Sequence, residues 1–383
     1  MNQYLPVIIN DSTLRDGEQA PGVAFALEEK VRIALALEEA GIDEIEAGTP
    51  AMGDAEIEII AATGRALQRA KAIAWCRMTR ADVDAAVRTG LKCANLSVPL
   101  SDLQIRVKFS TGREDVIRRI REVIPYALNR GLQVSLGGED ASRANLDFVC
   151  AAMLAAEEAG ATKFRFADTL GILDPFLTHT IFRRLRAETD MDLEFHGHYD
   201  LGLATANTLA AVRAGATHAS VCVLGLGERA GNATLEEVVA GLALIYSRKT
   251  GVDLSRLAGL ADMVASAAKR PIPAAKPIVG GAAFTHESGI HVSALLKDPE
   301  TYEAVDPRRF GRRRKYVLGK HSGTAAVVNA LQALGLTADN ESLGLILEQV
   351  RTHATKMKQA VGPVELRQFY ANVNTLGWMG RPN

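Results

Sequence analysis

Residues 133–167 read QVSLGGEDASRANLDFVCAAMLAAEEAGATKFRFA and hold one complete strand, helix, strand repeat. Two short apolar runs, Gln133–Leu136 and Lys163–Ala167, have the length and composition of strands. Between them, Leu146–Ala159 places apolar residues at helical spacing, and Gly160 follows as a typical helix stop. The stretch therefore predicts two parallel strands joined by a helical crossover.

The same alternation repeats from the N-terminus to about residue 250. Further strands are predicted at Val7–Asn10, Glu44–Ala47, Ala72–Cys76, Ala94–Val98, Leu193–His196 and Ala219–Leu224. Further helices are predicted at Leu27–Ala40, Ala55–Ala70, Arg113–Asn129, Pro175–Glu188, Thr205–Ala214 and Thr234–Ser247. Eight repeats of this size indicate an α/β fold, the TIM (β/α)8 barrel, whose active site gathers at the C-terminal ends of the strands. A doubly wound open sheet is the structural alternative.

The pattern changes after the eighth helix. Residues 270–277 carry three prolines in the sequence RPIPAAKP, which can neither continue a helix nor form a central strand. Two helical patterns follow at Thr324–Leu334 and Leu343–Val361. We therefore expect a catalytic barrel over residues 1–265, a linker and small subdomain over 266–320, and a small helical C-terminal subdomain over 321–383.

Composition narrows the class of partner. The 383 residues contain 44 lysines and arginines against 45 acids, a net charge of -1, so nothing attracts the chain to nucleic acid or to an acidic membrane surface. There is no signal-peptide pattern at the N-terminus and no apolar run as long as the ~18 residues of a membrane span. These features predict a soluble, cytoplasmic protein that acts on small molecules.

A histidine pair points to a metal site. In a strand, side chains at i and i+2 point to the same side, so His196 and His198 should project together. Two imidazoles form half of a divalent metal site and need a carboxylate to complete it, although two surface histidines can also fall two apart by chance. The ends of strands 1, 5, 6, 7 and 8 should face one pool, and they carry Asp16, Glu139, Asp168, the histidine pair and Asn232.

Several motifs in fixed order carry a family resemblance. They are DSTLRDGEQ at residues 11–19, HGH at 196–198, GLGERAGN at 225–232 and FTHESGIH at 284–291. Together they resemble the 2-isopropylmalate synthase/homocitrate synthase family of metal-dependent acyltransferases on a DRE-type TIM barrel. Within that family the motifs look most like homocitrate synthases of the nitrogen-fixation type. The resemblance covers essentially the whole chain.

The resemblance implies a reaction and a set of residues for it. The reaction is condensation of acetyl-CoA with 2-oxoglutarate and thioester hydrolysis, giving homocitrate and CoA. The implied ligands of a divalent cation (Mg²⁺, Mn²⁺, Co²⁺ or Zn²⁺) are Asp16, His196, His198 and, more weakly, Asn232. The implied catalytic residues are Arg15, Glu139, His291 and Tyr302, and the implied substrate-binding residues are Arg15, Gln19 and Thr169. Because His291 and Tyr302 come from the tail, the resemblance also implies an intertwined homodimer.

Departures from the family pattern leave the substrate open. Tyr199 and Leu224 stand where the family commonly has asparagine or aspartate, which should alter the pocket rim. In lysine-pathway homocitrate synthases an arginine and a serine on strand 5 hold the distal carboxylate, whereas the matching positions here are Ser135 and Gly137. The group that holds this carboxylate is therefore unidentified.

Other activities remain as alternatives. A 2-isopropylmalate or citramalate synthase would use the same machinery on another 2-oxo acid, although the length of the chain argues against the usual isopropylmalate enzyme. The related lyases typically stop soon after the barrel, so the long tail favours synthesis. A metal-binding scaffold without activity is a third reading. The basic stretch at Arg308, Arg309, Arg312, Arg313, Arg314 and Lys315 is either a solvated face or a contact for CoA phosphates or a partner subunit.

Overall fold

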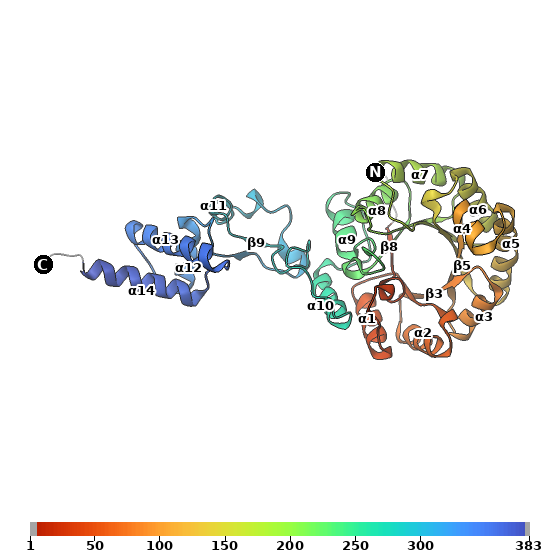
Figure 1. Cartoon of the computed structure of the whole chain (residues 1–383), viewed down its shortest axis with the longest axis horizontal. Coiled ribbons are helices and arrows are strands. Elements are labelled where there is room, and N and C mark those ends of the chain that lie inside the picture. Colours follow the sequence, from red (N-terminus) through yellow and green to blue (C-terminus); the bar gives the residue numbers. More distant parts are fainter. Residues whose placement is uncertain (1–5, 380–383) are drawn as a thin grey trace. The chain divides into compact units, whose positions relative to one another are not determined.

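Eight parallel strands close into a barrel in the computed structural model, which describes residues 6–379 (Figure 1). The strands are β1 (Ile8–Asp11), β2 (Glu44–Gly48), β3 (Lys71–Arg77), β4 (Cys93–Pro99), β5 (Gln133–Glu139), β6 (Lys163–Asp168), β7 (Asp192–Gly197) and β8 (His218–Val221). They pair in sequence order, and β8 pairs with β1 through the register Ile8 to His218. This closing pair confirms the predicted TIM barrel and excludes the open sheet.

Helices surround the barrel on its outer side (Figure 1). They are α1 (Leu27–Glu39), α2 (Asp54–Ala66), α3 (Arg80–Arg88), α4 (Asp102–Phe109), α5 (Arg113–Asn129), α6 (Leu146–Glu158), α7 (Pro175–Glu188), α8 (Ala204–Arg213), α9 (Leu235–Leu244) and α10 (Leu257–Ala267). The sequence did not predict α3, α4 or α10. The predicted eighth strand was also too long, because it ends at Val221 and a 3-10 turn over Val223–Gly225 follows, with Leu224 at φ 59°.

β6 and β7 show how the strands pack against the outer helices and which side chains face the barrel interior. On the outer face, Phe166 and Phe195 contact Phe182 of α7, with ring centroids 5.8 and 5.7 Å apart. The alternate positions face the interior and are charged, with Lys163 and Arg165 on β6. Aromatic burial therefore attaches the helices, and the period of two in each strand turns charges inward.

The barrel interior is crossed by a chain of buried ion pairs. Lys163 Nζ contacts Glu44 and lies 2.9 Å from Glu194 Oε2. Arg165 contacts Glu194 through Nε and lies 2.7 Å from Glu46 Oε1. Burial alone would raise the pKa of Glu46, but Arg15 and Arg165 lower it to about 2. Each buried charge in this chain therefore lies next to a charge of opposite sign, which offsets the cost of removing it from water.

A second compact unit begins at Pro273 and is mainly helical, as predicted for the C-terminal region. Its strands β9 (Thr285–His286) and β10 (Lys315–Tyr316) pair in parallel. Its helices are α11 (Gly289–Leu295), α12 (Thr324–Ala333), α13 (Asn340–Met357) and α14 (Pro363–Met379), of which α11 and α14 were not predicted. Its core includes Val292, Val327, Ile346, Val350 and Leu366. Within residues 6–379, none of the helices combines the length and apolar character that a bilayer crossing demands.

Candidate metal centre and active site

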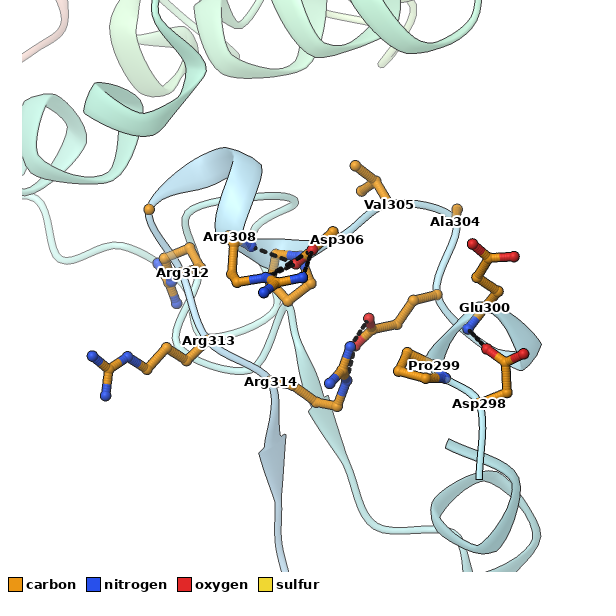
Figure 2. Close-up of a pocket in the computed structure, with 13 residues that line it drawn as sticks. Asp298, Pro299, Glu300, Ala304, Val305, Asp306, Arg308, Arg312, Arg313 and Arg314 are labelled. Atoms are coloured by element: carbon orange, nitrogen blue, oxygen red, sulfur yellow. Dashed lines mark hydrogen bonds and ion pairs between the residues drawn. The ribbon is translucent and has the colours of Figure 1, made fainter. Parts of the chain in front are cut away.

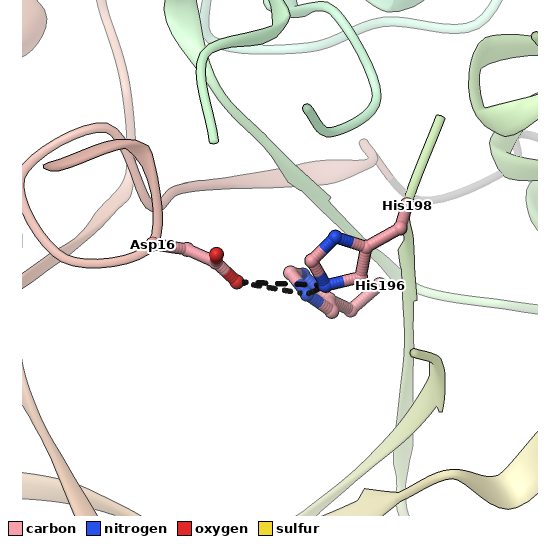
Figure 3. Close-up of side chains that lie close together, drawn as sticks. All are labelled: Asp16, His196 and His198. Atoms are coloured by element: carbon pink, nitrogen blue, oxygen red, sulfur yellow. Dashed lines mark hydrogen bonds and ion pairs between the residues drawn. The ribbon is translucent and has the colours of Figure 1, made fainter. Parts of the chain in front are cut away.

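Three predicted ligands converge at the C-terminal end of the barrel. Asp16 lies in the loop after β1, whereas His196 and His198 project from β7 and from the residue just beyond it (Figure 3). Asp16 Oδ2 lies 3.1 Å from His196 Nε2 and 3.9 Å from His198 Nε2. The two Nε2 atoms lie 3.3 Å apart. All three side chains are buried.

The chemistry of this set fits a divalent cation. Ligand atoms each about 2.1 Å from one ion and at right angles to each other stand roughly 3 Å apart, close to the spacing found here. Burial and then the charge of His196 lower the pKa of His198 to about 4, so its imidazole is neutral and can bind a metal. Burial would raise the pKa of Asp16, but Arg15 and His196 hold it well below its usual value. His196 Nδ1 lies 3.0 Å from Ser220 Oγ, which leaves Nε2 toward the cluster.

Asn232 is adjacent to this cluster through the backbone. It forms an isolated β-bridge with His198, and its side chain is buried. Its Nδ2 donates to Leu226 O at 2.9 Å, whereas Oδ1 has no hydrogen-bond partner among the described residues. The turn that carries it requires glycine at 231, where φ is +95° and a Cβ would stand 1.9 Å from Gly225 O. An unpaired buried oxygen is costly, and a cation would satisfy it.

Arg15 is held rigidly beside the cluster. Its Nε donates to Glu46 Oε2 at 2.8 Å, and its NH2 lies 2.6 Å from the same oxygen. Its NH1 donates to Asp16 Oδ2 at 3.1 Å, and the guanidinium lies over the Trp75 ring at 5.4 Å. A guanidinium fixed in this way cannot reorient, so its remaining donors face one direction.

A cavity of about 240 Å³ opens next to the cluster. Among the residues predicted for the site, those that line it are Arg15, Asp16, Gln19, Glu139, Thr169, His196 and His198. Glu139 binds Lys108 Nζ at 2.6 and 2.7 Å, and Thr169 Oγ1 accepts from Asp140 N at 2.8 Å. Asp168 is not among the lining residues, because its carboxylate accepts from the backbone of Ile172 and Leu173.

The sequence did not identify half of the cavity wall. The lining residues it missed are Trp75, Asn95, Ser97, Arg165, Ala167, Glu228 and Arg229, together with Gly137, which it noted only as a departure. Most of them lie within strands rather than at strand ends. The sequence does contain a signal for such residues. In a strand that is buried on both faces, charged residues at every second position, such as Arg165, should face the barrel interior. Neither Tyr199 nor Leu224 is among the lining residues.

The remaining two predicted catalytic residues lie in the second unit. The rings of His291 and Tyr302 stack with centroids 4.0 Å apart, and both side chains are exposed. His286 lies in the same unit, with its Nε2 3.7 Å from Glu303 Oε1. His291 and Tyr302 therefore form one exposed pair, which suits contact with a ligand or with another chain.

Four residues of the basic stretch, Arg308, Arg312, Arg313 and Arg314, line a cavity of about 1170 Å³ in the same unit (Figure 2). Arg308 pairs with Asp306 at 2.6 Å, and Arg314 pairs with Glu303. Arg312 donates to the backbone oxygens of Val279 and Gly280. Figure 2 shows Arg313 pointing away from these pairs. Since acids pair with Arg308 and Arg314, the stretch acts in part as a structural ion-pair network.

Two family models match the chain, one over the barrel and one over the second unit. Residues 6–264, which span the barrel, match the family model described as HMGL-like. Residues 278–358 match a second model, described as homocitrate synthase post-HMGL domain-like. The chain belongs to the HMGL-like family. Enzymes of this family are metal-dependent, in agreement with the cluster of Asp16, His196 and His198.

Relatives within the family carry three activities in their names. A 2-isopropylmalate synthase of Caldanaerobacter subterraneus is 43% identical, covering 97% of this chain and 97% of its own length. A homocitrate synthase of Frankia alni is 47% identical over 85% of this chain and 93% of its own. A putative (R)-citramalate synthase of Archaeoglobus fulgidus is 43% identical over 93% of this chain and 73% of its own. This chain is thus a member of the condensing acyltransferases.

One of these relatives and one solved structure bear on the earlier alternatives. The 2-isopropylmalate synthase of Caldanaerobacter subterraneus has nearly the same extent as this chain, so chain length does not separate that activity from homocitrate synthesis. A solved HMG-CoA lyase of Bacillus subtilis superposes with a TM-score of 0.64 at 21% identity and covers 71% of this chain and 97% of the lyase. That likeness supports the barrel fold alone.

Proposed function

We propose that the protein is a homocitrate synthase that condenses acetyl-CoA with 2-oxoglutarate. The observation that carries the proposal is the convergence of Asp16, His196 and His198 beside the fixed guanidinium of Arg15, at the catalytic end of a barrel. The match of residues 278–358 to the homocitrate synthase domain and the 47% identity to the Frankia enzyme support the choice of product.

The barrel residues would hold the oxo acid in a reactive geometry. Asp16, His196 and His198, with Asn232 Oδ1 as a further oxygen, would hold a divalent cation. When bound, such a cation would be chelated by the carboxylate and carbonyl oxygens of a 2-oxo acid and would act as a Lewis acid toward the carbonyl. Arg15 would donate to the oxygen that gains negative charge as the carbon bond forms. Gln19 and Thr169 line the same cavity and would orient the oxo acid.

Condensation also requires a proton transfer from acetyl-CoA. Glu139 would take a proton from the acetyl methyl group, with Lys108 Nζ holding its carboxylate in place. The methyl carbon would then bond to the carbonyl carbon, and the carbonyl oxygen would take up a proton from water and become a hydroxyl. Water hydrolyses the thioester and releases CoA. His291 and Tyr302 would supply donors for the thioester oxygen from the tail of a neighbouring subunit in a homodimer.

A substrate panel tests the proposal. Purified protein would be assayed for free thiol with acetyl-CoA, a divalent metal and either 2-oxoglutarate, 2-oxoisovalerate or pyruvate. We expect CoA release to be fastest with 2-oxoglutarate. The alternatives are 2-isopropylmalate synthesis, favoured by the relative that matches 97% of both chains, and citramalate synthesis. Preferential turnover of 2-oxoisovalerate would establish the first instead, and preferential turnover of pyruvate the second.

A further inference from the structure

One buried donor in the cavity wall has no partner. Asn95 lies on β4, is 1% exposed and lines the cavity next to the metal cluster. Its Oδ1 accepts from Ser135 Oγ at 3.3 Å, whereas its Nδ2 has no hydrogen-bond partner among the described residues. A buried amide N–H without an acceptor is destabilising, so such a group in a binding cavity indicates an acceptor on the ligand.

The neighbouring strand makes room for this amide. Gly137 of β5 pairs in register with Ser97, two residues after Asn95 on β4. A Cβ at residue 137 would stand 3.0 Å from Asn95 Oδ1 and 3.2 Å from Nδ2, closer than ordinary van der Waals contact. Any side chain at 137 would therefore press against the Asn95 amide. The glycine and the asparagine form one arrangement, in which the amide occupies the volume that a residue 137 side chain would fill.

The charge of the cavity indicates what the acceptor is. Three arginines (Arg15, Arg165, Arg229) and three carboxylates (Asp16, Glu139, Glu228) line it, and charged groups behind the wall pair with several of them. A divalent cation held by Asp16, His196 and His198 would add two positive charges to this lining. That added charge would attract a 2-oxo dicarboxylate more strongly than a 2-oxo acid with one carboxylate. Arg165, in register with Gly137 on the next strand, also lines the cavity, and its guanidinium is paired with Glu46 and Glu194.

We propose that Asn95 Nδ2, left without a protein partner beside Gly137, receives the distal carboxylate of a 2-oxo dicarboxylic acid and thereby selects it over monocarboxylic 2-oxo acids. The inference rests on the proposed function, because it assumes that the reacting end of the oxo acid lies at the metal cluster. It assigns specificity to a residue on β4 rather than to Ser135 on β5.

Binding measurements test this assignment without turnover. Calorimetric titration of the full chain with Mn²⁺ would compare 2-oxoglutarate with 2-oxobutyrate, which has the same oxo and carboxylate groups but ends in a methyl group. Replacing Asn95→Leu should lower the preference for 2-oxoglutarate over 2-oxobutyrate about 10- to 100-fold, the cost of leaving one buried polar partner unpaired. Asn95→Asp, which keeps the shape but repels a carboxylate, should lower it at least as far.

Two further variants check the geometry. Asn207 of α8 is as buried as Asn95 but is not among the lining residues, so Asn207→Leu should lower the melting temperature and leave the preference unchanged. In the Asn95→Ala background, Gly137→Ser places a hydroxyl in the vacated volume and should restore part of the preference. Circular dichroism would verify that each variant is folded.

The outcomes separate this inference from the proposed function. A preference within about threefold of wild type in both Asn95→Leu and Asn95→Asp would overturn the inference, as would a wild-type protein that does not bind 2-oxoglutarate. If 2-oxoglutarate binds through Asn95 but no CoA is released from acetyl-CoA, the inference stands and the proposed synthase activity fails.

Discussion

At the residue scale, the two imidazoles and the carboxylate of the cluster are placed to bind one common ligand. The two imidazole Nε2 atoms lie 3.3 Å apart, and a carboxylate oxygen lies 3.1 Å from one of them. Their lone pairs therefore converge on a point that favours positive charge. A proton or a cation at that point offsets the repulsion between these lone pairs and the carboxylate charge.

Removing one imidazole should release the metal. The variant His196→Ala should retain less than about a tenth of the metal bound by the wild type after dialysis, because a primary ligand contributes more than the 10- to 100-fold in affinity typical of outer partners. Elemental analysis measures the metal content, and thiol release measures activity, which should be lost. His179→Ala, on α7, is the matched control and should keep both. Full metal content in His196→Ala would contradict the ligand assignment.

Asp11 makes stability depend on pH. Burial raises its pKa from 3.8 to about 7, and its Oδ2 has no hydrogen-bond partner among the described residues. Between these pKa values the folded protein binds one more proton than the unfolded chain, so stability is lost as pH rises toward 7. Asp11→Asn keeps the acceptor for Thr13 N and removes the charge.

The gain in melting temperature from Asp11→Asn should therefore be small near pH 4.5 and grow to a plateau above pH 7. Thermal unfolding of both proteins at several pH values between 4.5 and 8 would measure it. A gain that is constant with pH would mean that Asp11 is ionised throughout.

At the element scale, β2, β6 and β7 are tied together by charges inside the barrel. Lys163→Met should lower the free energy of unfolding by about 3 to 5 kcal/mol, because Glu44 and Glu194 would lose a buried partner. Urea denaturation measures this. Arg184→Ala removes a half-exposed partner of Glu188 and should change stability little. Equal effects of the two substitutions would mean that the interior charges are solvated.

The elements themselves were largely predictable, for local reasons. Gln133–Leu136 and Lys163–Ala167 begin where β5 and β6 begin, because the alternation of apolar runs and glycine stops is encoded locally. The eighth strand was overextended, because Ala219–Leu224 is apolar except for Ser220. The left-handed backbone at Leu224, whose N–H donates to Glu236 twelve residues later, marks the end of the strand. Such a bond has no local signature.

The candidate site also contains residues that the sequence predicts and residues that it does not. Strand-end position and the period of two predicted that Asp16, His196 and His198 face one pool, and the family resemblance identified Asp16 as the carboxylate ligand. Arg165 and Asn95 lie inside strands and matter because of partners on other strands, namely Glu46 and Gly137. Their roles depend on the register of the closed barrel, which a single strand does not specify.

At the scale of the whole molecule, the barrel cluster and the pair His291–Tyr302 belong to separate compact units. If the tail of one subunit serves the barrel of its neighbour, two inactive variants should complement each other. Mixing Asp16→Ala with His291→Ala after mild dissociation should restore about a quarter of wild-type activity, because half of the random dimers would hold one intact site. Thiol release measures the recovery, and each variant alone serves as its control.

No recovery, with mixed dimers verified by mass spectrometry, would place the tail and the barrel of one chain in the same site. Native mass would then still report whether the protein is a dimer.

The shared acceptor Glu46 has a consequence for protein engineering. It binds both Arg15, in the site, and Arg165, in the ion-pair chain of the barrel. A designer who transplanted the visible motif, the loop of Arg15 and the two histidines, into another barrel would bring an arginine without its counter-charge. The portable unit is larger than the motif, since it includes the interior carboxylates that fix the guanidinium. Directed evolution of this scaffold should accordingly find paired replacements at Glu46 and Arg165 more often than single ones.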